Sequence, residues 1–178
     1  GEIETEPYTT SESGRIMLED VRAGRYSLKE LVAQLTPEEM AKLCVGRIIR
    51  DERGKSIIGA ASTTVPGAAG ETTADLLESR GIRNIVLADG PAGLRLEPHF
   101  QTDREGRYLG GWGNLASRPY ETPKDKEVID YYQYCTAIPI ATSLAQTWDL
   151  ELIEEAGKIV GEEMKELGVT LWLAPGMN

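Results

Sequence analysis

The sequence predicts an α/β fold, and three neighbouring segments carry that prediction. Residues 85–89 and 169–174 are short, continuous apolar runs of the kind that forms buried strands. Residues 150–167, which lie between them, repeat apolar side chains at helical spacing, with Asp149 before the segment and Gly168 after it as cap residues. A strand, a helix and a second strand in this order are typical of a parallel βαβ crossover.

Length and charge limit the classes of protein to which the chain can belong. It has 178 residues, which is one domain or a piece of a larger protein, and 40% of them are hydrophobic, enough for a core. Its 29 acidic and 19 basic residues give a net charge of −10, which argues against nucleic acid and an anionic membrane surface as the main partners. We find no apolar run of about 18 residues for a transmembrane helix. Residues 1–7 are acidic and do not resemble a signal peptide.

The chain has only two cysteines and one histidine. These counts exclude zinc ribbons, zinc fingers and other Cys/His metal clusters, so we expect no metal and no cofactor. Cys44 and Cys135 fit a reduced intracellular protein at least as well as a disulfide, which favours a cytoplasmic location. Cys44 follows the apolar spacing of its helix and is expected to be a small buried residue.

The amino-terminal third contains a polar lead-in followed by two predicted helix starts. We interpret residues 1–26 as a solvated lead-in or linker, with an extended piece near residues 15–18. Ser27 with Glu30 forms a capping box, and Thr36-Pro37 marks a second helix start that runs towards Gly46. Residues 65–73 are expected to form an exposed loop before a helix at 73–79. This loop is not a phosphate loop, because it has Glu71 where such a loop needs a lysine.

Asp89 is the strongest candidate for a functional residue. It ends the apolar run 85–89 and begins the segment Asp-Gly-Pro-Ala-Gly-Leu-Arg. The carboxyl end of a buried parallel strand is where α/β folds build their sites. A structural interpretation stays open beside this one, in which Asp89 only caps the turn that follows.

Residues 90–135 show neither a helical nor a strand period, which predicts a functional loop or an insertion. The aromatic side chains there, Trp112, Tyr131, Tyr132 and Tyr134, suggest either a stacking platform for a sugar or a small satellite core that holds the loop. We favour the satellite core. The glutamates of 150–167 are interpreted as a solvated helix face rather than as catalytic acids.

Four segments together resemble one known family. They are LVAQLTPEEMAKL at residues 31–43, LADGPAGLR at 87–95, AIPIATSLAQTW at 137–148 and LWLAPGMN at 171–178. They are similar to the amino-terminal part of the catalytic barrel of family 3 glycoside hydrolases, and in particular to bacterial β-glucosidases. The resemblance covers about residues 27–178. It implies the first part of an irregular TIM-type (β/α)8 barrel, incomplete in this chain, with an insertion at about 96–134 and an antiparallel strand near 136–140.

This resemblance also implies a function and a role for individual residues. Such enzymes hydrolyse terminal, non-reducing β-D-glucosyl residues with retention of configuration. Asp89 then binds the substrate sugar, while Gly90, Pro91 and Arg95 support its loop. Retention requires two catalytic carboxylates about 5–5.5 Å apart. The family's nucleophile lies in a Ser-Asp-Trp motif that this sequence lacks, so the chain alone is predicted to be inactive.

The implied partners are a β-glucoside or oligosaccharide substrate, and either the remainder of the same enzyme or a second copy of the chain. The alternative function is that of a non-catalytic sugar-binding or structural α/β domain. A nucleotide-binding fold is excluded, because Asp89-Gly-Pro lacks the further glycines of a dinucleotide-binding turn.

Overall fold

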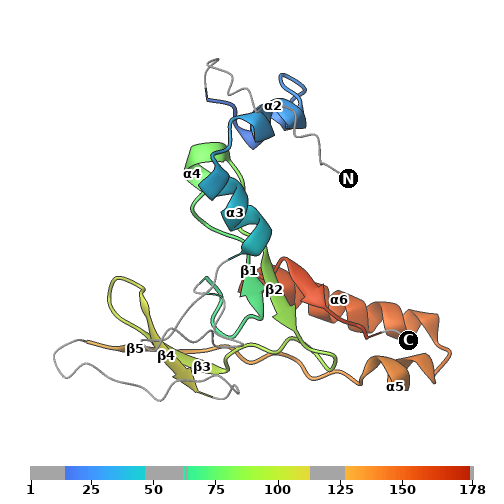
Figure 1. Ribbon diagram of the computed structural model, residues 1–178. Coiled ribbons are helices and arrows are strands. Elements are labelled where there is room, and N and C mark those ends of the chain that lie inside the picture. Colours follow the sequence, from blue (N-terminus) through green and yellow to red (C-terminus); the bar gives the residue numbers. More distant parts are fainter. Residues whose placement is uncertain (1–14, 47–61, 63, 113–126, 177–178) are drawn as a thin grey trace, which may run out of the picture. The chain divides into compact units, whose positions relative to one another are not determined.

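The structure is a computed structural model that describes residues 15–46, 62, 64–112 and 127–176 (Figure 1). The chain divides into two compact units. One contains residues 1–46 and 72–84, and the other contains residues 47–71 and 85–178. The fold is mixed α/β, with two small sheets that both belong to the second unit. The part of the chain that the structure describes therefore does not close into a barrel.

The described part of the first unit consists of four short helices. They are α1 (Leu18–Arg22), α2 (Leu28–Ala33), α3 (Pro37–Val45) and α4 (Leu77–Arg80). Ser27 Oγ accepts a hydrogen bond from the amide of Glu30, and Thr36 Oγ1 accepts one from the amide of Glu39. The predicted capping box at Ser27 and the predicted helix start at Thr36 are thereby confirmed. Helix α4 begins at Leu77 and not at residue 73 as predicted, and Gly81 ends it in the left-handed conformation, with φ 69°.

Apolar side chains from several segments form the interior of this unit, and they are Ile16, Leu31, Leu35 and Leu76. The polar composition of residues 1–26 predicts neither α1 nor the burial of Ile16. Arg80 Nη2 donates to the carbonyl of Gln34 at 2.8 Å and so ties α4 to the end of α2. The prediction that Cys44 is buried is wrong. It is exposed, because α3 contributes no fully buried residue to this interior.

In the second unit, one sheet carries the predicted crossover. Strands β1 (Gly70–Glu71), β2 (Val86–Asp89) and β6 (Leu171–Leu173) lie in the order β1-β2-β6. Strands β2 and β6 are parallel, with Ala88 opposite Trp172. Helices α5 (Ala141–Ala145) and α6 (Leu150–Leu167) lie between them in the chain (Figure 1). The βαβ prediction is confirmed, as are the caps of α6. Asp149 Oδ1 accepts from the amide of Leu152 at 3.0 Å, and Gly168 has φ 76°.

The core of this unit forms around β2 and α6. Its buried members are Val65, Ala68, Val86, Ala88, Leu94, Leu96, Val160 and Val169. The expectation of an exposed loop at 65–73 is therefore wrong, since no residue of this segment is exposed and it includes strand β1. The backbone of Gly67 lies so close to the next segment that a Cβ there would be 2.1 Å from the amide nitrogen of Glu97. The prediction of a buried strand holds for alternate residues of β2, whereas Leu171 and Leu173 of β6 are 48% and 45% exposed.

A second sheet occupies much of the segment that was expected to be irregular. Strands β3 (His99–Thr102), β4 (Tyr108–Trp112) and β5 (Ile129–Tyr132) are antiparallel, with β3 in the centre (Figure 1). The antiparallel strand expected near 136–140 is not formed, because residues 133–140 run as irregular chain. The antiparallel neighbour of β2 is instead β1.

Helix α6, with 18 residues, is the longest helix among the described residues, and many of its side chains are charged. None of the helices in the described ranges has both the length and the apolar character needed to cross a membrane.

Candidate functional site

The candidate site is built on Asp89, the last residue of β2. Its Oδ2 accepts a hydrogen bond from Arg95 Nη2 at 2.6 Å, and its carbonyl accepts one from the amide of Arg95 at 2.8 Å. The two side chains are 39% and 56% exposed. An ion pair this exposed contributes at most about 1 kcal/mol to stability. Its clearer consequence is geometric, since it holds the carboxylate in one orientation at the end of the strand.

Two glycines allow the chain to turn sharply after Asp89. Gly90 has φ 145° and Gly93 has φ 107°, which are conformations that other residues rarely adopt. A Cβ on Gly90 would lie 1.7 Å from the carbonyl oxygen of Gly93, and a Cβ on Gly93 would lie 2.1 Å from the carbonyl oxygen of Thr136. The turn is therefore packed against itself and against residues around 136 too tightly for a side chain at either position.

Three contacts from distant parts of the sequence fix this turn. Trp172 Nε1 on β6 donates to the carbonyl of Gly90 at 2.8 Å. The amide of Ile138 donates to the carbonyl of Ala92 at 3.0 Å. Glu163 Oε1 on α6 accepts from the amide of Thr136 at 2.8 Å, and thus holds the segment against which Gly93 packs.

Neither Trp172 nor Glu163 was predicted to take part in the site. An indole N–H in an otherwise apolar strand was a usable signal, because a partly buried tryptophan nitrogen needs an acceptor. Glu163 offered no such signal, since it lies among other glutamates of α6.

Glu163 also affects the cysteine beside it. Burial of the Cys135 thiol, together with the negative charge of Glu163, raises the pKa of Cys135 above its ordinary value. A raised pKa leaves less thiolate, the reactive form, so Cys135 is not an activated nucleophile. Glu163 Oε2 is buried and has no hydrogen-bond partner among the described residues.

A cavity of about 400 Å³ lies beside the turn. Its lining comes from the turn, from the residues that lead into β3, and from the residues that follow β5. The lining residues are Gly90, Pro91, Ala92, Leu94, Arg95, Leu96, Pro98, Gln133, Tyr134 and Cys135. Arg95 thus contacts Asp89 and also borders this cavity.

Aromatic rings lie on both faces of the second sheet. His99 and Tyr132 face each other across β3 and β5 and stack at 4.4 Å, and Tyr134 stacks on Tyr132 at 6.2 Å. Phe100 and Tyr131, one residue along each strand, stack at 5.2 Å on the opposite face.

These tyrosines do not form the small buried core that we favoured. Tyr131, Tyr132 and Tyr134 are 44%, 63% and 76% exposed. The reason is that β5 is an edge strand whose four residues are all exposed. Their rings contact one another without being covered, which leaves the sugar-platform interpretation open.

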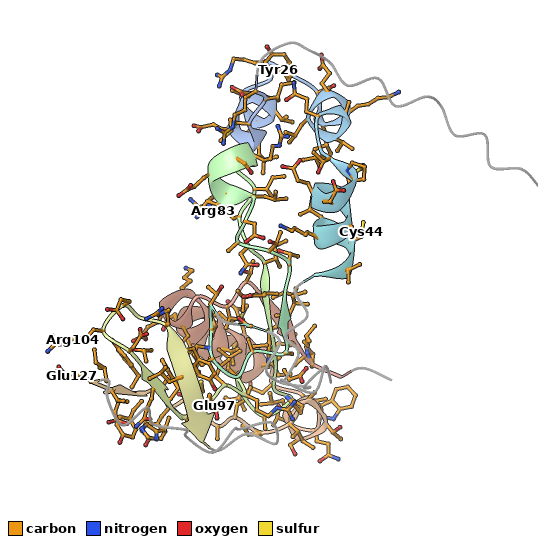
Figure 2. The ribbon with its side chains drawn as sticks, turned by 60° about the vertical axis from the view of Figure 1, so that its left-hand side comes forward. Tyr26, Cys44, Arg83, Glu97, Arg104 and Glu127 are labelled. Atoms are coloured by element: carbon orange, nitrogen blue, oxygen red, sulfur yellow. The ribbon has the colours of Figure 1, made fainter. Side chains whose placement is uncertain are left out.

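Polar contacts surround the aromatic rings. Asp130 Oδ1 accepts from Gln101 Nε2 and from His99 Nε2, each at 2.8 Å. The hydrogen bonds from Gln101 and His99 hold the pKa of the Asp130 carboxyl below its ordinary value. Figure 2 shows Arg104 and Glu127, which form an ion pair between the β3–β4 turn and the residues before β5.

The described residues contain no group of three or more His, Cys, Asp or Glu side chains that could hold a metal ion. The site that they do form has one carboxylate, one guanidinium and a neighbouring cavity. A carboxylate held in this way can accept hydrogen bonds from two hydroxyl groups of a polyol. This arrangement is suited to binding a sugar, and by itself it provides no pair of catalytic carboxylates.

Residues 128–178 match the model of the family described as "Glycosyl hydrolase family 3 N terminal domain". Over 151 residues the chain is 29% identical to the thermostable beta-glucosidase B of Acetivibrio thermocellus, an alignment that covers 85% of this chain and 14% of that protein. It is 26% identical over 178 residues to a beta-glucosidase of Ruminococcus albus, covering 100% of this chain and 14% of that protein.

An exo-alpha-(1->6)-L-arabinopyranosidase of Bifidobacterium longum is 32% identical over 102 residues, covering 57% of this chain and 11% of that protein. A solved beta-glucosidase structure from Paenibacillus barengoltzii superposes with a TM-score of 0.59 at 28% identity. It covers 97% of this chain and 14% of that one. The chain thus spans about one seventh of the length of the three β-glucosidases named here.

Proposed function

We propose that the chain is part of a glycosyl hydrolase family 3 enzyme, whose N-terminal domain residues 128–178 match, and that it supplies one wall of the sugar site of a retaining β-glucosidase. The substrate is a β-glucoside or oligosaccharide with a terminal, non-reducing β-D-glucosyl residue. The observation that carries the proposal is the carboxylate of Asp89 at the carboxyl end of a parallel strand. Open α/β sheets and barrels bind their ligands at that end of their strands.

In this proposal Asp89 binds the sugar and its neighbours shape the loop. The carboxylate accepts hydrogen bonds from sugar hydroxyls, and Arg95 holds it in position through the contact at 2.6 Å. Gly90 and Pro91 form the turn, which Trp172 fixes through the carbonyl of Gly90. Each hydrogen bond to the charged carboxylate contributes about 1.5–3 kcal/mol to binding.

The same proposal assigns the parallel strands β2 and β6 to an irregular (β/α)8 barrel. Strand β6 supports the assignment to a barrel. It pairs with β2 along one edge, and its residues Leu171 and Leu173 are nearly half exposed. A barrel of this kind takes about 250 residues. Residues 27–178 are proposed to belong to the barrel domain, with residues 1–26 as lead-in and about 96–134 as an insertion that carries the second sheet.

The remaining partner is proposed to be the rest of the same enzyme, or a second copy when the chain is isolated. An apolar cavity of about 580 Å³ supports this proposal. It lies between α5, α6 and the end of β6, and its lining includes Leu144, Ile153 and Trp172. Exposed apolar surface of this kind marks a surface that another part of a protein covers.

Activity of the isolated chain tests the proposal. Both catalytic carboxylates are proposed to come from outside residues 1–178. The purified chain should therefore not hydrolyse p-nitrophenyl β-D-glucoside above the buffer background. The full-length enzyme should release glucose as the β-anomer first, observed by NMR during hydrolysis.

Two results would contradict this proposal. Hydrolysis that stays with the chain through further chromatography would place the catalytic carboxylates within it. A full-length protein that binds glucosides without cleaving them would favour the non-catalytic sugar-binding domain instead.

A further inference from the structure

Trp172 holds the main chain at the residue that follows Asp89. Strand β6 runs parallel to β2, and Trp172 directly precedes Leu173, the residue opposite Asp89. From this position the indole reaches the end of β2, where its Nε1 donates to the carbonyl oxygen of Gly90 at 2.8 Å. The other two residues of β6 are leucines, whose side chains have no hydrogen-bond donor. The contact therefore depends on the indole N–H of this one side chain.

Arg95 also contacts Asp89, but it does so in a different way. Its Nη2 donates to Oδ2 of the carboxylate at 2.6 Å, so it occupies part of the group that is proposed to accept the sugar hydroxyls. Trp172 binds a main-chain oxygen and occupies neither oxygen of the carboxylate. The indole is also partly buried, whereas the side chains of Asp89 and Arg95 are 39% and 56% exposed. Trp172 can therefore hold the turn without competing with a sugar.

The conformation of Gly90 makes this hold necessary. Gly90 is buried and has φ 145°, which side chains rarely allow, and its own backbone is the least restricted of any residue. Contacts must then fix its orientation. A buried carbonyl needs a hydrogen-bond donor, so loss of the indole N–H favours rotation of this peptide towards another donor. Only one residue separates that peptide from Asp89, and the carboxylate moves with it.

The ring of Trp172 also borders the apolar cavity of about 580 Å³ that lies between α5, α6 and the end of β6. On its inner side the ring packs against the core of the second unit. In the proposed full-length enzyme the rest of the protein covers this cavity and excludes water from the ring. A hydrogen bond in such surroundings is stronger than one exposed to water. The contact with Gly90 should therefore be stronger in the full-length enzyme than in the isolated chain.

We propose that Trp172 is a positioning residue for substrate binding, whose indole N–H sets the place of the Asp89 carboxylate through the carbonyl of Gly90. The inference rests on the proposed function. It adds to that function a residue that affects sugar binding without touching the sugar.

A double-mutant cycle in the full-length enzyme tests the inference. Trp172→Phe keeps an aromatic ring and removes the N–H. It should lower kcat/KM for p-nitrophenyl β-D-glucoside about 10-fold to 100-fold, because a misplacement of about 1 Å can cost about 100-fold. In the Asp89→Ala enzyme the same change should alter kcat/KM by less than about twofold, since the carboxylate that Trp172 positions is gone. A side chain that only stabilises the fold would lower kcat/KM by the same factor in both backgrounds.

Two matched changes sharpen the test. Replacement of Trp172 by 3-benzothienylalanine puts sulfur in place of the N–H in a ring system of nearly the same shape. It should reproduce the loss seen with Trp172→Phe. Thr170→Val removes a hydrogen bond between the same two segments at the other end of β2, where the amide of Val86 donates to Thr170 Oγ1 at 3.3 Å. It should leave kcat/KM within about twofold of wild type, as for most exposed substitutions.

An unchanged kcat/KM for Trp172→Phe would overturn the inference and leave the proposed function intact. Equal losses in the wild-type and Asp89→Ala backgrounds would do the same. So would a loss for Thr170→Val as large as that for Trp172→Phe, because the effect would then come from the pairing of β2 with β6. If Asp89→Ala itself kept kcat/KM within about threefold of wild type, the proposed role of Asp89 would fail, and the inference with it.

Discussion

The β1-β2-β6 sheet and the β4-β3-β5 sheet each have three strands, but they are held by different kinds of contact. In the first, Val86 and Ala88 are 2% and 0% exposed and pack with side chains of α6. In the second, all four residues of β5 are exposed, and stacked rings and ion pairs link the strands. One sheet relies on apolar burial and the other on surface contacts.

This difference indicates how stability and specificity are divided in the second unit. Burying a valine side chain contributes about 1.5–3 kcal/mol, whereas an exposed ion pair contributes about 0–1 kcal/mol. The proposed sugar-binding carboxylate of Asp89 lies on the sheet with the strong contacts. The exposed rings of Tyr131 and Tyr132 lie on the sheet with the weak ones. Precise binding needs a rigid support, while surface loops tolerate the variation that changes specificity.

The largest expected difference between the two regions concerns one glycine in each. In Gly90→Ala the new Cβ would lie 1.7 Å from the carbonyl oxygen of Gly93, so the backbone after β2 must move. We expect a loss of more than about 4 kcal/mol in the free energy of unfolding. Gly106, in the β3–β4 turn, has φ 78° and open space around it, so Gly106→Ala should cost only about 1–2 kcal/mol.

Denaturant unfolding of the full-length enzyme, followed for both variants, measures this difference. An equal loss in the free energy of unfolding for Gly90→Ala and Gly106→Ala would show that backbone strain at positive φ accounts for the whole effect. The tight packing of the Asp89 turn would then carry no stability of its own.

A smaller effect is expected from acid, and within the second unit it should fall on the second sheet and its β3–β4 turn, which contain Asp130 and Asp103. Asp103 Oδ2 accepts from Arg107 Nε at 2.7 Å, and its Oδ1 accepts from the amide of Arg107 at 2.8 Å. Desolvation raises the pKa of this carboxyl, but the hydrogen bonds from Arg107 outweigh it and hold the pKa below its ordinary value of 3.8. A lowered pKa in the folded state stabilises the protein above the unfolded-state value.

The β3–β4 turn should therefore keep its full stability above about pH 4 and lose it progressively as the pH falls below 3.8 towards the folded-state pKa. Melting temperatures of wild type and Asp103→Asn, compared from pH 6 down to pH 3, measure this. The difference between them should shrink as the pH falls. A difference that stays constant over this range would mean that the ionised carboxylate does not support the turn.

The sequence was sufficient to predict those elements whose signals are local. The period of apolar residues along α6, with Asp149 and Gly168 at its ends, predicted that helix and its caps. The apolar run that ends in Asp89 predicted β2 and its place in a parallel crossover. In both cases the side chains that define the element lie within one segment, so a local pattern is enough.

The second sheet and the contacts around the site could not be predicted in this way. Strand β3 has four residues, too few for a clear alternation, and β4 contains two glycines. The aromatic rings of β3 and β5 stack only when the strands pair in the folded protein. The contact of Trp172 with Gly90 joins residues 82 positions apart, and that of Glu163 with Thr136 joins residues 27 apart. Such pairs depend on the tertiary fold rather than on any local pattern.

The central claim is that the carboxylate of Asp89 binds the substrate sugar, and kcat/KM of Asp89→Ala in the full-length enzyme tests it most directly. Two charge-assisted hydrogen bonds of about 1.5–3 kcal/mol each predict a decrease of about 10² to 10⁴ in kcat/KM. Asp89→Asn keeps the shape without the charge and should fall between wild type and alanine. The melting temperature should change little, because the pair with Arg95 is largely exposed. A variant with a lowered melting temperature and kcat/KM within about threefold of wild type, a change under about 1 kcal/mol, would contradict the claim and make Asp89 a turn residue only.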